Sequence, residues 1–343
     1  MKKLLNTLYV TSYDKYLSLE GETIVITVEK EEVNRIPLHN LQSIVTFGYA
    51  GISPALMGKC AENNISVSFL SRSGRYLANI TGQENGNVIL RKTQYRISDD
   101  DEKCTKIARN FIIGKLYNSR WVIERTLRDH SDCVDREKLK KVSDELKNTI
   151  PKLYNCNSTQ ELRGFEGEAA TRYFSVFDDL VLRNKETFFF RGRNKRPPLD
   201  NVNALLSFSY TLLASMCSSA LYSVGLDPYV GFMHKDRPGR ISLALDLMEE
   251  LRSVYADRFV LTMINKNMLG ENDFLQKENQ AVIFTEDGKK KFLNSWQLKK
   301  KETLTHPYLQ EKVEWGMVPY IQAMLLARYL RGDIDEYPPF LWK

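Results

Sequence analysis

The spacing of hydrophobic residues changes once along this chain of 343 residues, and the change restricts the architectures that the chain can adopt. Up to about residue 98, apolar and polar residues alternate as they do in half-buried strands, most clearly at 23–28, 43–47 and 65–69. From residue 99 the apolar residues recur at helical spacing. We therefore predict an α+β chain with a β-rich N-terminal domain (1–98) and a mainly α-helical domain (99–343), a length that suits two domains.

Composition restricts the class of protein only weakly. The chain has 49 basic and 43 acidic residues, a formal net charge of +6 that permits nucleic-acid binding without demonstrating it. Its five cysteines are odd in number and show no CxxC spacing, which argues against a disulfide framework or a zinc ribbon. Reduced thiols in a cytoplasmic protein are the simpler expectation.

The most apolar run, at 202–224, has the length of a membrane span. It contains Asn203 and six serines, with Asp200 before it and Asp227 after it. These polar residues favour the buried central helix of a soluble domain. We therefore expect no membrane partner.

A helix with a clear beginning is expected from residue 158. Ser158 and Glu161 have the spacing of a capping box, in which a hydroxyl and a carboxylate satisfy free backbone N–H groups. Apolar residues then recur from Leu162 to Leu180, and Glu166 lies inside this apolar stripe. Because burying an ionised carboxylate is costly unless it is paired or binds a metal, Glu166 is a candidate metal ligand.

A second acidic cluster is expected on a helix that begins near Ser242, after a Gly/Pro-rich turn that carries His234. Helical geometry places Asp246, Glu249 and Glu250 on one face, opposite an apolar face. Three acids on one patch repel one another, and a bound cation would turn that repulsion into attraction.

Each of these residues also has an ordinary structural interpretation. Acidic helix faces are usually solvated, and a lone histidine in a loop is more often a hydrogen-bonding group than a ligand. Arg237 and Arg240 are compatible with simple surface charges, and Arg252 is placed to pair with Asp246 or Glu249 on its own helix. The combination of a carboxylate in an apolar stripe, a histidine and a carboxylate patch is what favours a metal site.

Glu166, His234 and Glu249 are therefore potential ligands of a divalent metal ion. Carboxylate oxygens with one imidazole suit Mn²⁺ and tolerate Mg²⁺, and the absence of thiolates argues against structural zinc. Basic residues nearby in the sequence would hold the phosphates of a polyanion. The candidates for this DNA-binding role are Arg193, Arg237, Arg240, Lys289 and Lys290.

These motifs, taken in order along essentially the whole chain, resemble the CRISPR-associated endonuclease family that acts as the integrase of spacer acquisition. The sequence from His234 to Arg240 resembles most closely that of the type I-C branch. The matching stretches are Ile36-Pro37-Leu38 through Phe47-Gly48, Gly164-Phe165-Glu166-Gly167, residues 196–206, Gly225-Leu226-Asp227-Pro228, Gly231-Phe232-Met233-His234, and residues 237–249.

The resemblance implies a β-rich N-terminal domain for dimerisation or interaction and an α-helical catalytic domain. It implies that Glu166, His234 and Glu249 are the metal ligands, with glutamate at a third position that is aspartate in some branches. Asp246 matches a further acidic position near the metal and is carried over as a catalytic residue. The implied partners are double-stranded DNA, a second copy of the chain in a homodimer, and a small dimeric second adaptation protein of the CRISPR system.

The implied activity is a metal-dependent DNA integrase and endonuclease, which inserts short fragments into a CRISPR array by attack of a 3′-hydroxyl on a phosphodiester. Two alternatives remain open on the residues alone. One is a metal-dependent phosphohydrolase of a small substrate, although no Gly-rich phosphate-binding loop follows a strand. The other is a non-catalytic DNA-binding or scaffold protein.

Overall fold

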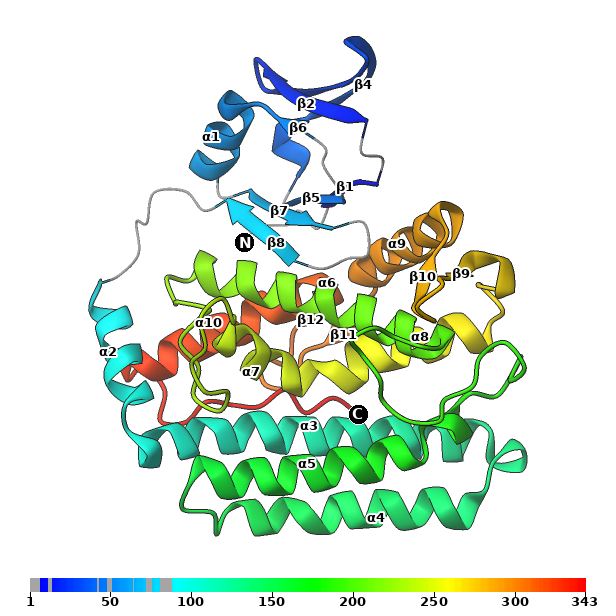
Figure 1. Cartoon of the computed structure of the whole chain (residues 1–343). Helices are drawn as coiled ribbons and strands as arrows, with labels where there is room; N and C mark the ends of the chain where they lie inside the picture. Colours follow the sequence, from blue (N-terminus) through cyan, green and yellow to red (C-terminus); the bar gives the residue numbers. More distant parts are fainter. Residues whose placement is uncertain are drawn as a thin grey trace. The chain divides into compact units, whose positions relative to one another are not determined.

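A computed structural model describes residues 7–11, 14–41, 43–47, 51–63, 65–71, 76–80 and 88–343. The chain divides into two compact units, one of residues 1–85 with 286–302 and one of residues 86–285 with 303–343 (Figure 1). This division differs in two places from the expected boundary at residues 98 and 99. Helix α2 (Val88–Ser98) belongs to the larger unit, and helix α9 (Glu286–Lys301) belongs to the smaller unit.

Within its described residues, the smaller unit contains two four-stranded sheets, of order β1-β5-β7-β8 and β4-β3-β2-β6. In the first sheet β1, β5 and β7 are parallel and β8 is antiparallel. The strands are β1 (Thr7–Val10), β2 (Lys15–Glu20), β3 (Thr23–Val28), β4 (Glu31–Pro37), β5 (Ser43–Phe47), β6 (Gly51–Ile52), β7 (Ser66–Leu70) and β8 (Tyr76–Ile80). The three strands expected from alternation are therefore confirmed.

Both sheets and helix α1 (Pro54–Glu62) contribute to one apolar core, which includes Leu17, Ile24, Ile44 and Val67. The core-facing residues include Leu17 on β2, Ile24 on β3 and Ile44 on β5, while consecutive buried residues on β3 and β5 show that neither face of these two strands is fully open to solvent. Helix α1 begins at Ser53, whose hydroxyl accepts a hydrogen bond from the Leu56 N–H at 3.2 Å. The β-rich character of the N-terminal part is thus confirmed.

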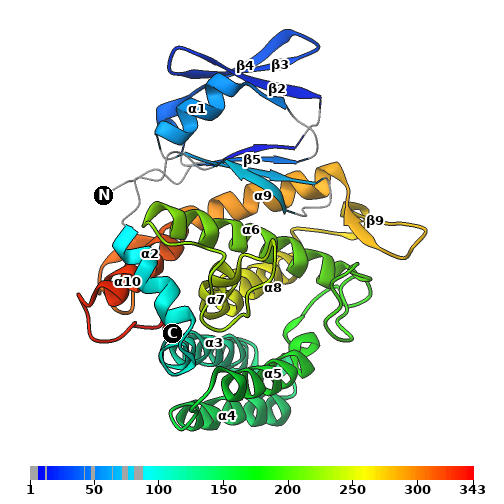
Figure 2. The same cartoon turned by 60° about the vertical axis from the view of Figure 1, so that its left-hand side comes forward.

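The larger unit is mainly helical, as predicted. The long helix α3 packs against α4, α5 and α7, and α6 packs against α7 and α10 (Figures 1 and 2). Two small hairpins, β9–β10 and β11–β12, complete the described part of this unit. The remaining elements are α3 (Asp101–Asp129), α4 (Arg136–Leu153), α5 (Thr159–Ser175), α6 (Asn201–Ser223), α7 (Ser242–Leu251), α8 (Arg258–Asn265), β9 (Phe274–Gln276), β10 (Val282–Phe284), β11 (Thr303–Thr305), β12 (Lys312–Glu314) and α10 (Val318–Arg331).

Helix α6 is the apolar run that has the length of a membrane span. Among the described residues it is the one helix that is long and apolar enough for such a span, and 67% of its most apolar window is buried inside the fold. Asp200 caps it by accepting a hydrogen bond from the Asn203 N–H at 2.7 Å. The prediction of a buried central helix is therefore confirmed.

Helix α5 begins where the capping-box spacing placed it, and Ser158 Oγ accepts a hydrogen bond from the Glu161 N–H at 3.2 Å. The Glu161 carboxylate, however, accepts from the Asn157 N–H at 2.9 Å rather than from the N–H of Ser158. The helix also ends earlier than expected, because its last apolar residues form the separate short 3₁₀ turn Phe177–Leu180.

Helix α7 is buried on every side. The apolar residues Leu243, Leu247 and Leu251 are fully buried, but so are Asp246 and Glu250, and Glu249 is only 2% exposed. The interpretation of these acids as an ordinary solvated face is therefore wrong. Each carboxylate must be satisfied inside the protein, because an uncompensated buried charge is strongly destabilising.

Residues 336–342 contact both α3 and α7, and they provide some of the hydrogen bonds that the buried groups of α7 need. Asn110 Nδ2 donates to the carbonyl of Tyr337 at 2.8 Å. Asn118 Nδ2 donates to the carbonyls of Glu250 at 2.6 Å and Phe340 at 2.7 Å. This C-terminal segment thereby ties α3 to α7.

The Glu250 carboxylate accepts hydrogen bonds from the Tyr337 hydroxyl, the Phe340 N–H and the Gln322 amide. Burial nevertheless raises the pKa of Glu250 from 4.5 to about 7. Between these two pH values the folded chain holds a proton that the unfolded chain has lost. Stability should therefore fall as the pH rises from 4.5 to 7.

We expect this one carboxyl group to change the free energy of unfolding by on the order of 3 kcal/mol over that pH range. The measurement is the melting temperature of the wild type and of Glu250→Gln from pH 4.5 to 8. The difference between the two proteins isolates this group from others, such as His306, whose pKa burial lowers to about 4. Parallel pH profiles for the two proteins would contradict the assignment.

Candidate active site

The loop before α7 holds His234 against the first carboxylate of that helix. His234 Nδ1 lies 2.5 Å from Asp246 Oδ1. The same carboxylate accepts hydrogen bonds from the N–H groups of Phe232, Met233 and His234, at 2.7, 2.9 and 3.0 Å. Because an ionised carboxylate can only accept, Nδ1 donates to Asp246, which leaves Nε2 as the ring nitrogen that can face a metal, as in metal-binding histidines.

Gly231 makes this arrangement possible. A Cβ atom at Gly231 would lie 2.8 Å from Asp246 Oδ2, 2.9 Å from Ser242 Cβ and 3.0 Å from the His234 carbonyl oxygen. The loop can therefore approach Asp246 closely only because residue 231 has no side chain.

Lys115 brings together the other two predicted ligands, which come from different helices. Its ammonium group contacts the Glu166 carboxylate on α5 and lies 2.7 Å from Glu249 Oε2 on α7. Lys115 itself lies on α3 and is only 6% exposed. Glu166 and Glu249 are therefore close enough to share one cation.

Arg252 is the second cation at this site, and its Nη2 lies 2.8 Å from Glu249 Oε1. It is the first residue of the π-helical segment Arg252–Asp257, which continues α7. Burial alone would raise the pKa of Glu249, but the positive charges of Arg252 and Lys115, with His234, bring it below its ordinary value. Glu249 is therefore ionised at neutral pH.

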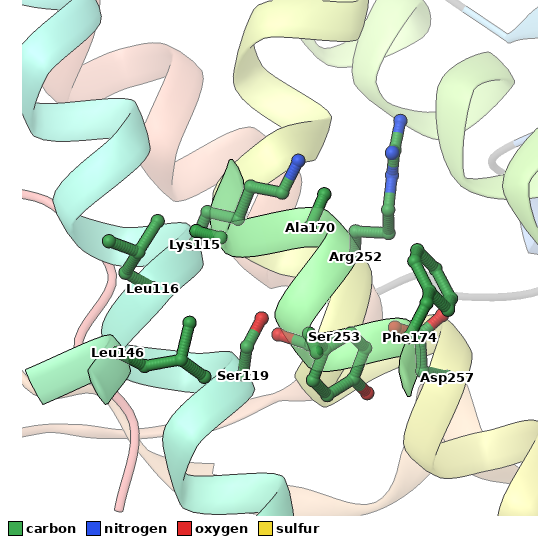
Figure 3. A pocket seen from close by; sticks show the side chains of 11 residues that line it. Lys115, Leu116, Ser119, Leu146, Ala170, Phe174, Arg252, Ser253 and Asp257 are labelled. Carbon is green, nitrogen blue, oxygen red and sulfur yellow. The ribbon is translucent and has the colours of Figure 1, made fainter. Parts of the chain in front are cut away.

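A pocket opens beside this cluster, between α3, α5 and the π-helical segment (Figure 3). Lys115 and Arg252 stand in the upper part of the view, and Ser119, Ser253 and Asp257 lie below them. Asp257 is buried and 2.5 Å from the Tyr210 hydroxyl, and burial raises its pKa to about 6. The remaining lining residues are mainly apolar, among them Leu116, Leu146 and Phe174, so the pocket combines an apolar wall with two cationic groups and a few hydroxyl and carboxyl groups.

The structure distributes the predicted DNA-binding residues over several places. Arg237 is exposed and Arg240 is half-buried in the loop that follows His234. Arg193 is engaged inside the larger unit, where its guanidinium donates to the Asn203 side chain at 2.6 Å and to Ser207 at 3.1 Å. Lys289 and Lys290 belong to α9 of the smaller unit.

The residues fit a divalent ion by two observations. Glu249 Oε2 is buried and accepts no hydrogen bond of regular geometry, and the contact of His234 with Asp246 uses Nδ1 rather than Nε2. In the described part of the chain no three ligating side chains already converge on one point, because the Lys115 ammonium lies between the two glutamates. Metal binding therefore requires this ammonium to move.

Lys115 and Arg252 are the site residues that the sequence analysis did not identify as functional. Lys115 interrupts the apolar run Phe111–Leu116, and a lysine in such a run needs a counter-charge if the run is buried. That signal was present in the sequence. The position of the counter-charge was not, because it comes from two distant helices.

Comparisons with known proteins identify relatives along the whole chain. The family model described as CRISPR associated protein Cas1 matches residues 8–298. The CRISPR-associated endonuclease Cas1 1 of Chlorobaculum tepidum is 48% identical over 343 residues and is covered completely, as is this chain.

Two solved structures share the fold. A casposase bound to its integration product matches with a TM-score of 0.84 and 25% identity, over 98% of this chain and 93% of that chain. A chain of a Cas6-RT-Cas1–Cas2 complex matches with a TM-score of 0.83 and 21% identity, over 100% of this chain and 36% of that chain.

Proposed function

Because the chain belongs to the Cas1 family of CRISPR-associated proteins, we propose that it is a metal-dependent DNA integrase and endonuclease that inserts short DNA fragments into a CRISPR array. The observation that carries the proposal is the convergence of Glu166 and Glu249 on one cation, together with a histidine that Asp246 holds on the loop before α7. The names of the endonuclease relative and of the integration-product complex support DNA as the substrate.

The proposed ligands are Glu166, Glu249 and Nε2 of His234. When bound, Mg²⁺ or Mn²⁺ supplies Lewis-acid chemistry, which polarises the target phosphate and lowers the pKa of the attacking 3′-hydroxyl. Asp246 fixes the orientation and tautomer of the imidazole. Arg252 and Lys115 neutralise negative charge that builds on the phosphate oxygens. A hydrolytic activity at the same site follows if water replaces the hydroxyl.

DNA is proposed to approach the site along the loop that carries Arg237 and Arg240. Exposed guanidinium groups contact backbone phosphates without regard to sequence, so binding should weaken as salt rises. Lys289 and Lys290 remain proposed phosphate contacts on α9. For Arg193 we propose an indirect role, since its hydrogen bonds hold the segment before α6.

The proposed assembly is a homodimer, with the smaller β-rich unit as the dimerisation or interaction element, that joins the small dimeric Cas2-type protein. The fold shared with a chain of a Cas6-RT-Cas1–Cas2 complex supports this partner. From the sequence of the turn between His234 and Arg240, we propose that the system is of type I-C. A cytoplasmic location likewise remains a prediction.

The deciding experiment is a strand-joining assay with a repeat-bearing supercoiled plasmid and a short duplex, with and without the partner protein. We expect joined DNA with Mn²⁺ or Mg²⁺ and none with a chelator. Turnover of nucleotides without joining would favour a small-substrate phosphohydrolase. DNA binding with neither reaction would favour a scaffold and overturn the proposal.

Asp246→Asn should weaken Mn²⁺ binding and strand joining by about 10–100-fold, because the amide presents a donor to groups that already donate. Titration calorimetry with Mn²⁺ and the joining rate are the two measurements. Asp236→Asn is the matched control, since Asp236 is exposed in the same loop and its loss should leave Mn²⁺ affinity unchanged. Equal affinity in both variants would remove Asp246 from the site.

A further inference from the structure

Lys115 occupies the place between the two glutamates that the proposed function assigns to a metal ion. Its ammonium contacts Glu166 on one side and lies 2.7 Å from Glu249 Oε2 on the other. The Lys115 side chain is 8% exposed and the Glu249 side chain 3%, so water screens this contact only weakly. In this position the Lys115 ammonium neutralises the two carboxylates in the way that a bound cation would.

We propose that Lys115 is a built-in counter-ion that holds Glu166 and Glu249 together in the metal-free protein and competes with the divalent ion for them. This inference rests on the proposed function, because it concerns the same two ligands. It adds a residue that sets how strongly the site binds metal.

Charge balance supports the competition. Without a metal, the two carboxylates of Glu166 and Glu249 face the two cations Lys115 and Arg252, and their charges cancel. Asp246 makes its contacts elsewhere, with His234 and with three backbone N–H groups, so Lys115 and Arg252 are the cations that face Glu166 and Glu249. Leaving Glu166 and Glu249 without Lys115 would set two like charges against each other, one of them buried and the other 22% exposed.

Arrival of a divalent ion would make the net charge of this cluster positive. The ion needs carboxylate oxygens that Lys115 now contacts, so the ammonium must withdraw while its stem stays on α3. The ion and the two cations together then exceed the two carboxylates by two positive charges. A phosphodiester offsets part of this excess, so a displaced Lys115 favours binding of the DNA backbone once metal is present.

The test uses Lys115→Met, which keeps the length of the side chain and removes its charge. We expect the variant to bind Mn²⁺ at least about tenfold more tightly than the wild type in titration calorimetry, because the internal competitor is gone. Its metal-free melting temperature should fall and be recovered with Mn²⁺. Lys106→Met is the matched control on the same helix, where the lysine pairs with exposed Glu102 at 2.9 Å.

Mn²⁺ affinity that is equal or weaker in Lys115→Met would overturn the inference, provided that Glu166→Gln weakens binding and so keeps the proposed metal site. If Glu166→Gln leaves Mn²⁺ binding unchanged, the proposed site itself fails, and the inference with it. The two failures are therefore distinguishable.

A second measurement does not depend on the variant's folding. Acylation of Lys115 in the wild-type protein, followed by mass spectrometry, should rise when Mn²⁺ is added, because the ammonium leaves its buried ion pairs. Labelling of Lys106 in the same sample should not change. Equal labelling of Lys115 with and without Mn²⁺ would overturn the inference.

Discussion

Glu166→Gln is expected to reduce the rate of strand joining by about a thousandfold or more, to the background of the assay. The change preserves the size of the side chain but removes one of the two charges that converge on the Lys115 ammonium. DNA binding should remain, because the proposed phosphate contacts come from other segments. The measurements are single-turnover strand joining and a fluorescence binding assay on the same DNA.

Glu168→Gln is the matched control for this variant. Glu168 lies on the same helix, its side chain is 56% exposed, and it pairs with Arg172 one turn away. Exposed pairs of this kind contribute only about 0–1 kcal/mol, so joining and stability should stay near wild type. Wild-type joining by Glu166→Gln would refute the catalytic assignment, whatever the control does.

Gly114→Ala should lower the free energy of unfolding by about 1–3 kcal/mol, as overpacking in a core does. Gly114 is the point on α3 where α7 passes, and a Cβ atom there would lie 2.7 Å from Glu250 Cβ. Neither atom can rotate away, because each is fixed directly to a helix backbone. The two helices must separate, and we expect a lower melting temperature together with weaker Mn²⁺ binding.

Gly167→Ala provides the comparison in a helix where space is open. No heavy atom lies within 4 Å of the added Cβ, so this variant should gain up to about 1 kcal/mol from the better helix propensity of alanine. Thermal unfolding of the two variants side by side gives the measurement. Equal stability would mean that α3 and α7 do not approach closely at Gly114.

Much of the fold follows from periodicity. The strands at Thr23–Val28 and Ser43–Phe47 are confirmed, although consecutive residues of both are buried, so the alternation in the sequence located the strands without showing which faces are covered. The start of α5 follows from Ser158, whose hydroxyl forms a local cap. These signals depend on neighbours in the sequence.

The parts that could not be predicted depend on neighbours in space. The helical spacing of the residues placed the acids of α7 on one face. It could not reveal that α3 and the segment 336–342 bury that face. The inclusion of α9 in the smaller unit is of the same kind. There Lys300 is buried and donates a hydrogen bond to Thr7, almost the whole chain away.

The roles of the candidate residues divide in the same way. His234 and Asp246 lie twelve positions apart, and the sequence identified both without giving their contact. Lys115 and Glu166 lie on separate helices, and only the packing of α3 against α5 brings them together. Arg237 and Arg193 both lie in basic turns of the sequence. In the fold, Arg237 is exposed, whereas Arg193 is hydrogen-bonded to the Asn203 side chain.

The support of Glu250 by Tyr337, Gln322 and Phe340 has a consequence during synthesis of the protein. A ribosome makes the helix that carries Glu249 long before it makes these three donors. Until they emerge, the carboxyl group next to Glu249 has no partners in the interior and draws water toward the helix. The packing that supports the buried carboxylates of this helix would therefore be completed only after residue 340 has been translated.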